Sequence, residues 1–114
     1  MSATQSNIFQ VSSEIPYEHA DAGIVRQIFG YDEKLMLVKV RFDKGAVGVL
    51  HRHVHSQASY VESGVFEVTI GDDKKILKAG DGFFIPSDVQ HGCFCLEAGQ
   101  LIDVFSPLRE EFIK

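Results

Sequence analysis

From about residue 24 onward, hydrophobic side chains recur at every second position, and this spacing limits the fold more than any other feature of the chain. The stretch LMLVKVRF (35–42) shows it most clearly, because Met36, Val38, Val40 and Phe42 alternate with other side chains. Successive side chains of a β-strand point to opposite faces, whereas an amphipathic helix repeats its apolar face every 3.6 residues. The sequence therefore predicts an all-β fold.

Other stretches continue the same pattern and are separated by turns. VFEVTI (65–70) and KKILK (74–78) flank a GDD turn and predict a hairpin, and GFFIP (82–86) and LIDVF (101–105) predict two more strands. Eight or more short strands of this kind are typical of a β-sandwich or a barrel, and a small barrel can hold one ligand inside. Only the tail PLREEFIK (107–114) predicts a short C-terminal helix, because a proline is followed by acidic residues.

The chain has 114 residues, which we divide into an N-terminal arm, residues 1–22, and a single domain, residues 23–114. Hydrophobic residues make up 45% of the chain, enough for a packed core. The net charge is −5, and no cluster of Lys or Arg is present. This charge distribution argues against nucleic acid or an anionic membrane as the main partner.

The first residues, MSATQSNIFQVSSE, are polar and lack the apolar core of a signal peptide, and no apolar run is long enough to span a bilayer. These features favour a cytoplasmic location. Cys93 and Cys95 lie two residues apart, a poor spacing for a disulfide along one strand. We therefore expect two free thiols, as is usual in the cytoplasm.

The stretch HRHVHSQ contains three of the five histidines of the chain. On a strand, His51, His53 and His55 would share one face, with Gln57 next in the same row. A further histidine, His91, follows a predicted strand and a proline turn in PSDVQHG. Imidazole is the commonest protein ligand of transition metals, so these residues predict a metal site, although alternating histidines also occur on a solvated strand edge.

The spacing of this first stretch is specific. Gly45 is followed by five residues, then His51, one residue, His53, three residues, Gln57, six residues and Gly64. This spacing resembles the first motif of the cupin superfamily, in which a glutamate occupies the position of Gln57. The resemblance implies a double-stranded β-helix, or jelly-roll barrel.

A second stretch has the spacing of the second cupin motif. Gly80 is followed by five residues, Pro86, one residue, Asp88, two residues, His91, three residues and Cys95. The chain departs from the motif in having Asp88 in place of a glycine and Cys95 in place of an asparagine. Neither of these is a usual ligand position, so the resemblance to a metal-binding cupin stands.

The resemblance implies that His51, His53, Gln57 and His91 hold one divalent transition metal, such as nickel, zinc, manganese or iron. One straight strand cannot direct all of these side chains to one ion, so the chain must bend near the histidines. His55 is then left as a residue that packs beside the site or contacts the substrate. The neutral amide of Gln57 leaves the ion its full charge, which favours Lewis-acid chemistry over that of iron oxygenases with a carboxylate ligand.

The segment IDVFSPLREEF supplies further candidates for the site. Asp103 and Phe105 would share a strand face, and Arg109 follows a Ser-Pro turn. A carboxyl group in an apolar barrel can have a raised pKa and act as an acid or base, and a guanidinium suits a substrate carboxylate. The simpler alternatives are a paired core aspartate, a core phenylalanine and a surface arginine.

Together with HxHxHxQ and IPxDVxHG, this segment resembles the small single-domain cupins of pectin and alginate breakdown. That subgroup converts 4,5-unsaturated monouronates, the products of polysaccharide lyases, into linear keto forms. The resemblance implies Asp103 as the catalytic acid/base, Arg109, Phe105 and His55 as candidate substrate-binding residues, a sugar acid as the ligand and a homodimer. Two alternatives stay open, a non-catalytic cupin that binds a small ligand and an iron dioxygenase with three histidine ligands.

Overall fold

The computed structural model describes residues 4–113, which fold almost entirely into antiparallel β-strands. The eight strands of this part of the chain are β1 (Glu18–Asp21), β2 (Ile24–Tyr31), β3 (Met36–Phe42), β4 (Val47–His51), β5 (Ser56–Ile70), β6 (Asp73–Lys78), β7 (Gly82–Ile85) and β8 (His91–Ser106). Each stretch that the spacing predicted as a strand corresponds, to within one residue, to β3, β7 or part of β5, β6 or β8. The predicted all-β jelly roll is confirmed.

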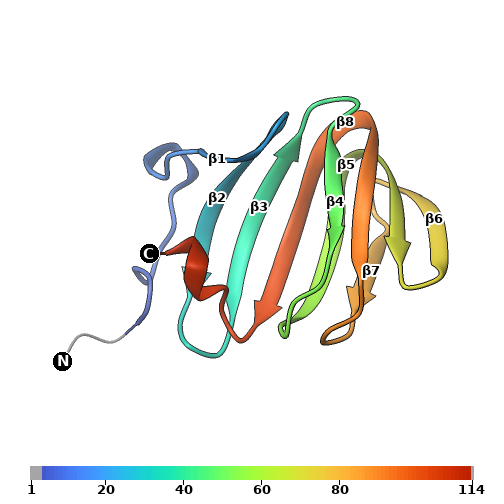
Figure 1. Cartoon of the computed structure of the whole chain (residues 1–114). Helices are drawn as coiled ribbons and strands as arrows, with labels where there is room; N and C mark the ends of the chain where they lie inside the picture. Colours follow the sequence, from blue (N-terminus) through green and yellow to red (C-terminus); the bar gives the residue numbers. More distant parts are fainter. Residues whose placement is uncertain (1–3, 114) are drawn as a thin grey trace.

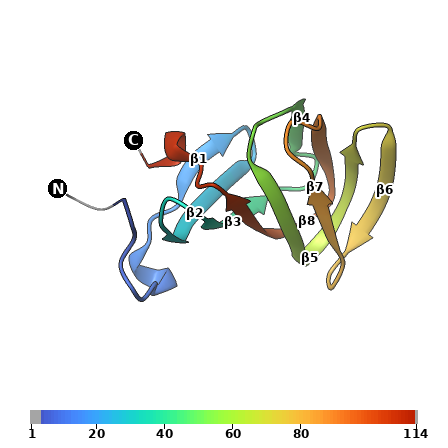
Figure 2. The same cartoon turned by 90° about the horizontal axis from the view of Figure 1, so that it is seen from below.

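The strands form one continuous sheet that curls into a barrel (Figures 1 and 2). Its order is β1-β2-β3-β8-β5-β6, while β4 pairs with another part of β8 and β7 with another part of β5. β5 and β8 are therefore shared by both halves of the barrel, and they pair with each other over most of their length. Their alternation places one row of side chains inside, which makes these two strands the main source of the barrel interior.

The long strands bend together at a pair of glycines. The register of β5 against β8 shifts between Val61 and Phe66. Gly64 has a φ of 85°, and a Cβ atom there would lie 2.6 Å from the Cα atom of Gly99 on the opposite strand. Only glycine tolerates both the positive φ and this approach. The Gly64 that closes the first motif thus allows β5 to turn the corner of the barrel.

The interior is divided into two apolar clusters. The larger is centred on the edge-to-face pair Phe42 and Phe66, whose ring centroids lie 5.1 Å apart. The smaller contains Met36, Val38, Phe105 and Leu108. Each buried side chain of this size stabilises the fold by roughly 1.5–3 kcal/mol.

The N-terminal segment lies along β2 rather than projecting from the barrel. It includes the 3-10 turn η1 (Ser12–Glu14) and strand β1, which pairs with β2. The buried amide of Gln27 on β2 donates hydrogen bonds to the backbone oxygens of Ser12, at 3.0 Å, and Ile15, at 2.8 Å. These bonds hold the segment against the outer face of the sheet.

The predicted C-terminal helix is present only as the 3-10 turn η2 (Glu110–Phe112). Leu108 is buried in the smaller cluster, and the Phe112 ring packs edge-to-face on Phe105, with centroids 6.0 Å apart. Both contacts hold this short segment across the barrel beside β1 and β2 (Figures 1 and 2). A helix of so few residues would not repay the cost of nucleation, so tertiary packing decides its path. No helix within residues 4–113 is long and apolar enough to cross a membrane.

Candidate metal centre and cavity

The histidine stretch does not form one strand. β4 ends at His51, β5 begins at Ser56, and the residues between them leave the sheet. His51 therefore lies at a strand end, His53 and His55 lie in the connection, and Gln57 is the second residue of β5. This break supplies the bend that a shared ion requires.

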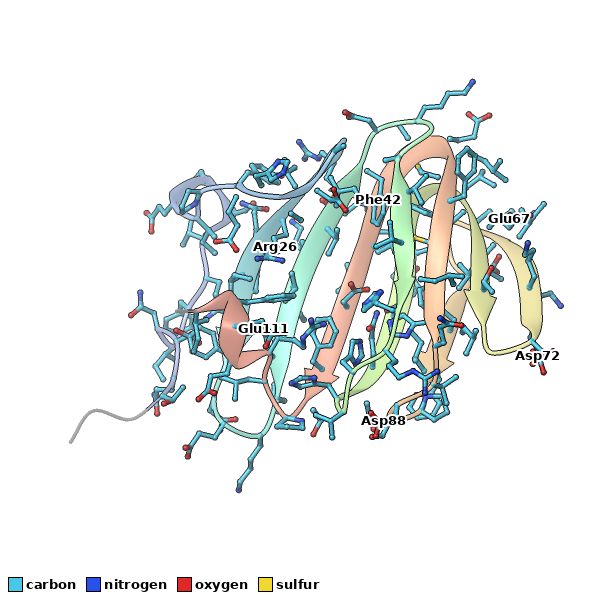
Figure 3. All side chains as sticks on the ribbon, viewed as in Figure 1. Arg26, Phe42, Glu67, Asp72, Asp88 and Glu111 are labelled. Atoms are coloured by element: carbon cyan, nitrogen blue, oxygen red, sulfur yellow. The ribbon has the colours of Figure 1, made fainter. Side chains whose placement is uncertain are left out.

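The turn before β8 fixes this connection in place. The backbone N–H of Asp88 donates to the carbonyl of His53 at 2.8 Å, and the Ser87 hydroxyl donates to the carbonyl of Val54 at 2.6 Å. Asp88 has a φ of 64°, which explains why the cupin motif has a glycine at this position and why the tolerant aspartate can replace it. Figure 3 shows Asp88 close to the lower ends of the strands that carry the site. The second motif thus positions the first.

The rings of His51, His53 and His91 meet at this end of the barrel. Their centroids are 5.4 Å apart for His51 and His53, 4.3 Å for His51 and His91, and 4.7 Å for His53 and His91. One ring nitrogen from each residue lies within 4.8 Å of the other two. Ligand atoms about 2.1 Å from one ion lie about 3 to 3.5 Å apart, so small rotations would bring all three to a metal.

Backbone carbonyls determine which ring nitrogen faces the centre. Nδ1 lies 2.8 Å from the carbonyl oxygen of Val49 in His51, 3.0 Å from that of His55 in His53, and 2.9 Å from that of Val89 in His91. A carbonyl oxygen only accepts, so each Nδ1 carries the proton and each Nε2 keeps its lone pair. All three imidazoles are therefore in the tautomer that binds a metal through Nε2.

Two further observations fit a cation at the centre. Nε2 of His91 is buried without a hydrogen-bond partner among residues 4–113, and Nε2 of His53 lies 3.2 Å from Oε1 of Gln57. Nε2 of His53 and Oε1 of Gln57 are both acceptors, so their closeness is unfavourable unless a cation lies between them. Burial lowers the pKa of His53, and it lowers that of His91 to about 4, so neither ring supplies that cation by protonation. The donor set of three imidazoles and one amide oxygen suits a divalent transition metal.

A chain of hydrogen bonds connects Gln57 to Asp103. The Gln57 amide donates to the Ser59 hydroxyl at 3.0 Å, and Ser59 donates to Oδ1 of Asp103 at 2.6 Å. This chain also orients the amide, because only its NH2 group can donate to Ser59, which leaves Oε1 towards the histidines. All three residues are buried.

The carboxyl group of Asp103 has an unusual environment. Burial raises its pKa to about 6, against the opposing effects of the hydrogen bond from Ser59, the charge of Arg109 and the amide of Gln57. The group can therefore change its protonation state near neutral pH, as an acid/base catalyst must. The prediction of Asp103 as an inward-facing carboxyl group agrees with this position on β8.

Arg109 and Phe105 lie next to this carboxyl group. The guanidinium of Arg109 lies 5.1 Å from the Phe105 ring centroid, and Phe105 in turn packs on His53, with centroids 5.9 Å apart. Nε and one terminal nitrogen of Arg109 contact a single oxygen of Glu111, at 2.8 and 2.7 Å. The charge of Arg109 contributes to the lowered pKa of both His53 and His91. Arg109 is therefore close enough to influence the histidine cluster.

These groups line one cavity of about 320 Å³ inside the barrel. Its polar walls include His51, Gln57, His91, Asp103 and Arg109, and most of the remaining wall is apolar. A volume of this size is at the lower end for small-ligand sites. The strand pattern predicted the cavity only in general terms, because it did not show which loops would cover it.

Sequence reasoning missed Ser59, and it left open whether Arg26 reaches the cavity or a partner subunit. Arg26 on β2 lines the cavity and places its guanidinium 3.8 Å from the Phe112 ring centroid. Ser59 forms the hydrogen-bonded connection described above. The period-two pattern could have indicated Ser59, since it follows Gln57 by two residues on an inward-facing row. No local sequence pattern predicts that the ring of Phe112 lies beside Arg26.

His55 and the two cysteines have secondary positions. His55 packs edge-on against His53, with centroids 5.4 Å apart, and is not among the residues that line the cavity. This position favours packing beside the candidate metal ligands over contact with a substrate. Both thiols are free, as expected: Cys93 lines the cavity and Cys95 belongs to the larger apolar cluster.

Comparison with known proteins agrees with this architecture. Residues 38–105 match the family model of the cupin domain. The chain is a cupin. It is 44% identical over 105 residues to the pectin degradation protein KdgF of Dickeya dadantii (strain 3937), and the match covers 90% of this chain and 96% of that protein. The predicted similarity to the cupins of pectin breakdown is confirmed.

Two solved structures have the same fold over nearly their whole length. An RmlC-like cupin from Shewanella frigidimarina NCIMB 400 is 47% identical with a TM-score of 0.93, and the match covers 96% of this chain and 98% of that chain. KdgF from Halomonas sp. is 38% identical with a TM-score of 0.89, and the match covers 94% of this chain and 99% of that chain. The shared fold therefore extends over nearly the whole of this chain and of both other chains.

Proposed function

We propose that this cupin converts 4,5-unsaturated monouronates, the products of pectin or alginate lyases, into linear keto-uronates with one divalent transition metal. Similarity over nearly the full length to proteins named KdgF, one of them a pectin degradation protein, supports a substrate derived from such polysaccharides. The observation that carries the proposal is Asp103, a carboxyl group with a raised pKa in the same cavity as the histidine cluster and Arg109. A site that only binds a ligand has no need of such a group.

The reaction neither adds nor removes atoms. The bond between carbon 1 and the ring oxygen breaks as the hemiacetal opens, and the enol formed at carbon 5 becomes a ketone when carbon 4 receives a proton. When bound, the metal ion would supply Lewis-acid polarisation of a substrate oxygen. The remaining tasks are to hold the carboxylate and to move the proton.

The residues of the chain fit these tasks. Asp103 is assigned to move the proton, because a carboxyl group with a pKa of about 6 gives and takes a proton near neutral pH. Arg109 is assigned to bind the carboxylate of the substrate, since its planar guanidinium donates two parallel hydrogen bonds to such a group. Phe105 supports Arg109 and provides an apolar wall. His51, His53, Gln57 and His91 would hold the metal.

The first experiment follows the conjugated double bond of a 4,5-unsaturated galacturonate by its ultraviolet absorbance. We expect the purified protein to speed the loss of absorbance, a chelator to stop it, and added metal to restore it. Nickel, zinc, manganese and iron should be compared, because histidine-rich sites accept all of them. If the absorbance is lost no faster with metal-loaded protein than without it, the proposal is wrong for this substrate.

The same assay separates the alternatives. A dioxygenase would consume oxygen and require iron, whereas linearisation proceeds without oxygen. A binding protein would retain the sugar acid without changing its absorbance. Asp103→Asn distinguishes these cases further. It should leave ligand binding intact in either case, and it should stop turnover if the protein is an enzyme.

A further inference from the structure

Arg26 belongs to the cavity wall but not to the set of residues assigned above. It enters from β2, on the side where β1 also lines the cavity through Ala20 and Asp21. Figure 3 shows Arg26 above Glu111, on the side of the barrel covered by the C-terminal turn. The histidines come from β4, the connection after it and β8. The arginine therefore faces the cavity from different strands than the metal ligands do.

Two arginines meet at this end of the cavity around one aromatic ring. The guanidinium carbon of Arg26 lies 3.8 Å from the Phe112 ring centroid, and that of Arg109 lies 4.6 Å from it. Such contacts hold a guanidinium plane against a ring face while its N–H groups remain available at the edges. Phe112 thus orients two sets of donors at the same cavity.

The contact with Glu18 engages only a small part of the hydrogen-bond donors of Arg26. Glu18 contacts Nε of Arg26 at 2.8 Å, and this contact engages one of the five N–H donors of the guanidinium. The side chain of Arg26 is 21% exposed and that of Glu18 is 44% exposed, so their pairing is a surface ion pair of small energy. The guanidinium can keep this contact and still donate to a ligand oxygen.

We propose that Arg26 forms a second oxygen-binding subsite next to that of Arg109, which holds the end of the sugar acid opposite the carboxylate that Arg109 binds. The choice of a sugar acid rests on the proposed function, but the subsite itself rests on the cavity and the two arginines. In an unsaturated uronate, the atoms held there would be the oxygens at carbons 1 and 2. Arg26 then determines specificity for a ligand with oxygen atoms at both ends.

Two six-carbon acids test the subsite without any turnover. Galactonate has a carboxylate at one end, and galactarate has one at each end. We expect metal-loaded protein to bind galactarate at least tenfold more tightly than galactonate in calorimetry, because a second charge-assisted hydrogen bond forms at Arg26. Arg26→Gln should reduce this ratio to about twofold or less, the most that the statistical advantage of a second carboxylate can give, with the metal content unchanged.

Two control variants separate ligand binding from a structural role. Arg41→Gln removes an arginine that also lies on an aromatic ring, 4.7 Å from the Tyr17 centroid, but outside the cavity lining. Glu18→Gln weakens the link between Arg26 and β1 and leaves the guanidinium in place. Both should keep the tenfold preference. The proposal is overturned if Arg26→Gln also keeps the tenfold preference for galactarate, or if it weakens the binding of both ligands equally. It is overturned as well if Glu18→Gln loses that preference.

Turnover gives a separate readout. If the uronate is the substrate, Arg26→Gln should raise KM about tenfold or more and change kcat little, because Arg26 is assigned to binding. If no uronate is linearised but galactarate binding still depends on Arg26, the subsite stands and the proposed reaction fails.

Discussion

The two ends of the cavity are held in place by different means. At the metal end, the three imidazoles are fixed by backbone carbonyls, and Gln57 is fixed through Ser59. At the arginine end, Arg26 and Arg109 are held by side chains, through the Phe112 ring and the exposed carboxylates of Glu18 and Glu111. Backbone positions are rigid and exposed ion pairs are not, so the metal end is preorganised and the arginine end can adjust to a ligand.

The largest test removes His51, one of the proposed metal ligands. His51→Ala should weaken metal binding more than about 100-fold and abolish turnover, because loss of a ligand exceeds the 10- to 100-fold effect of losing a supporting partner. His51 is exposed at the end of β4, so the fold should survive the change. Metal analysis after dialysis and the absorbance assay measure the two effects.

His19→Ala is the matched control, since His19 is also an exposed strand histidine but lies on β1 and outside the histidine cluster. It should retain both metal and activity. Full metal occupancy in His51→Ala would show that the preorganised cluster is not the metal site.

The second test removes the acid/base group and keeps the metal end. Asp103→Asn should lower kcat by about 10²- to 10⁴-fold, the usual contribution of general acid-base catalysis, with the metal content unchanged. Asp21→Asn, which changes another cavity carboxylate, should retain most of the activity. An active Asp103→Asn variant would remove Asp103 from the mechanism.

The third test loosens the metal end without removing a ligand. In Ser59→Ala, the Gln57 amide loses the acceptor that orients it, and the carboxyl group of Asp103 loses its hydrogen-bond donor. We expect metal affinity to fall about 10-fold and kcat to fall as well, as for other supporting partners of metal ligands. Ser59→Thr should restore both, because it returns the hydroxyl.

Ser63→Ala, on the same strand beyond the cavity, is the control for a general loss of stability. A Ser59→Ala variant with normal metal affinity and a lower melting temperature would indicate a purely structural role for the hydroxyl. The absorption spectrum of bound cobalt would report the ligand field directly.

The same contrast explains what could be predicted from the sequence. The alternating pattern predicted the strands, and the spacing of two short motifs predicted the cluster, because His51, His53 and Gln57 lie within seven residues and His91 lies at a turn. The cluster followed from the resemblance to the cupin motifs, because its histidines do not lie on one strand, whereas the strands themselves follow from strand geometry. The Asp103 position followed for the same reason.

The arginine end depends on contacts between residues far apart in the chain. Arg26 on β2 meets Phe112 at the other end of the sequence, and this contact exists only after the C-terminal segment crosses the barrel. The predicted helix is reduced to a 3-10 turn for the same cause, since Leu108 and Phe112 are held by long-range packing that overrides local propensity. Periodicity contains no information on such contacts.

The smallest test addresses the flexibility of the arginine end. Burial raises the pKa of Glu111, but its backbone hydrogen bond and its hydrogen bond and ion pair with Arg109 outweigh this, so its pKa is lowered overall. Its contribution to stability is therefore present above the pKa of the unfolded chain and is lost as the pH falls through the lowered value. Because the Glu111 side chain is 55% exposed, Glu111→Gln should cost about 1 kcal/mol or less at pH 7 and less than that at pH 3.

Metal-free protein suits this measurement, because chemical denaturation at the two pH values then reports the ion pair alone. If the arginine end is adjustable, Glu111→Gln should also change KM for the uronate less than threefold, since releasing Arg109 from an exposed carboxylate is nearly neutral in energy. A loss of several kcal/mol, or a loss of turnover as great as in Asp103→Asn, would show that Glu111 holds Arg109 as firmly as the backbone holds the histidines. The two ends of the cavity would then be equally rigid, and the ligand would have to fit an arginine end that is already fixed.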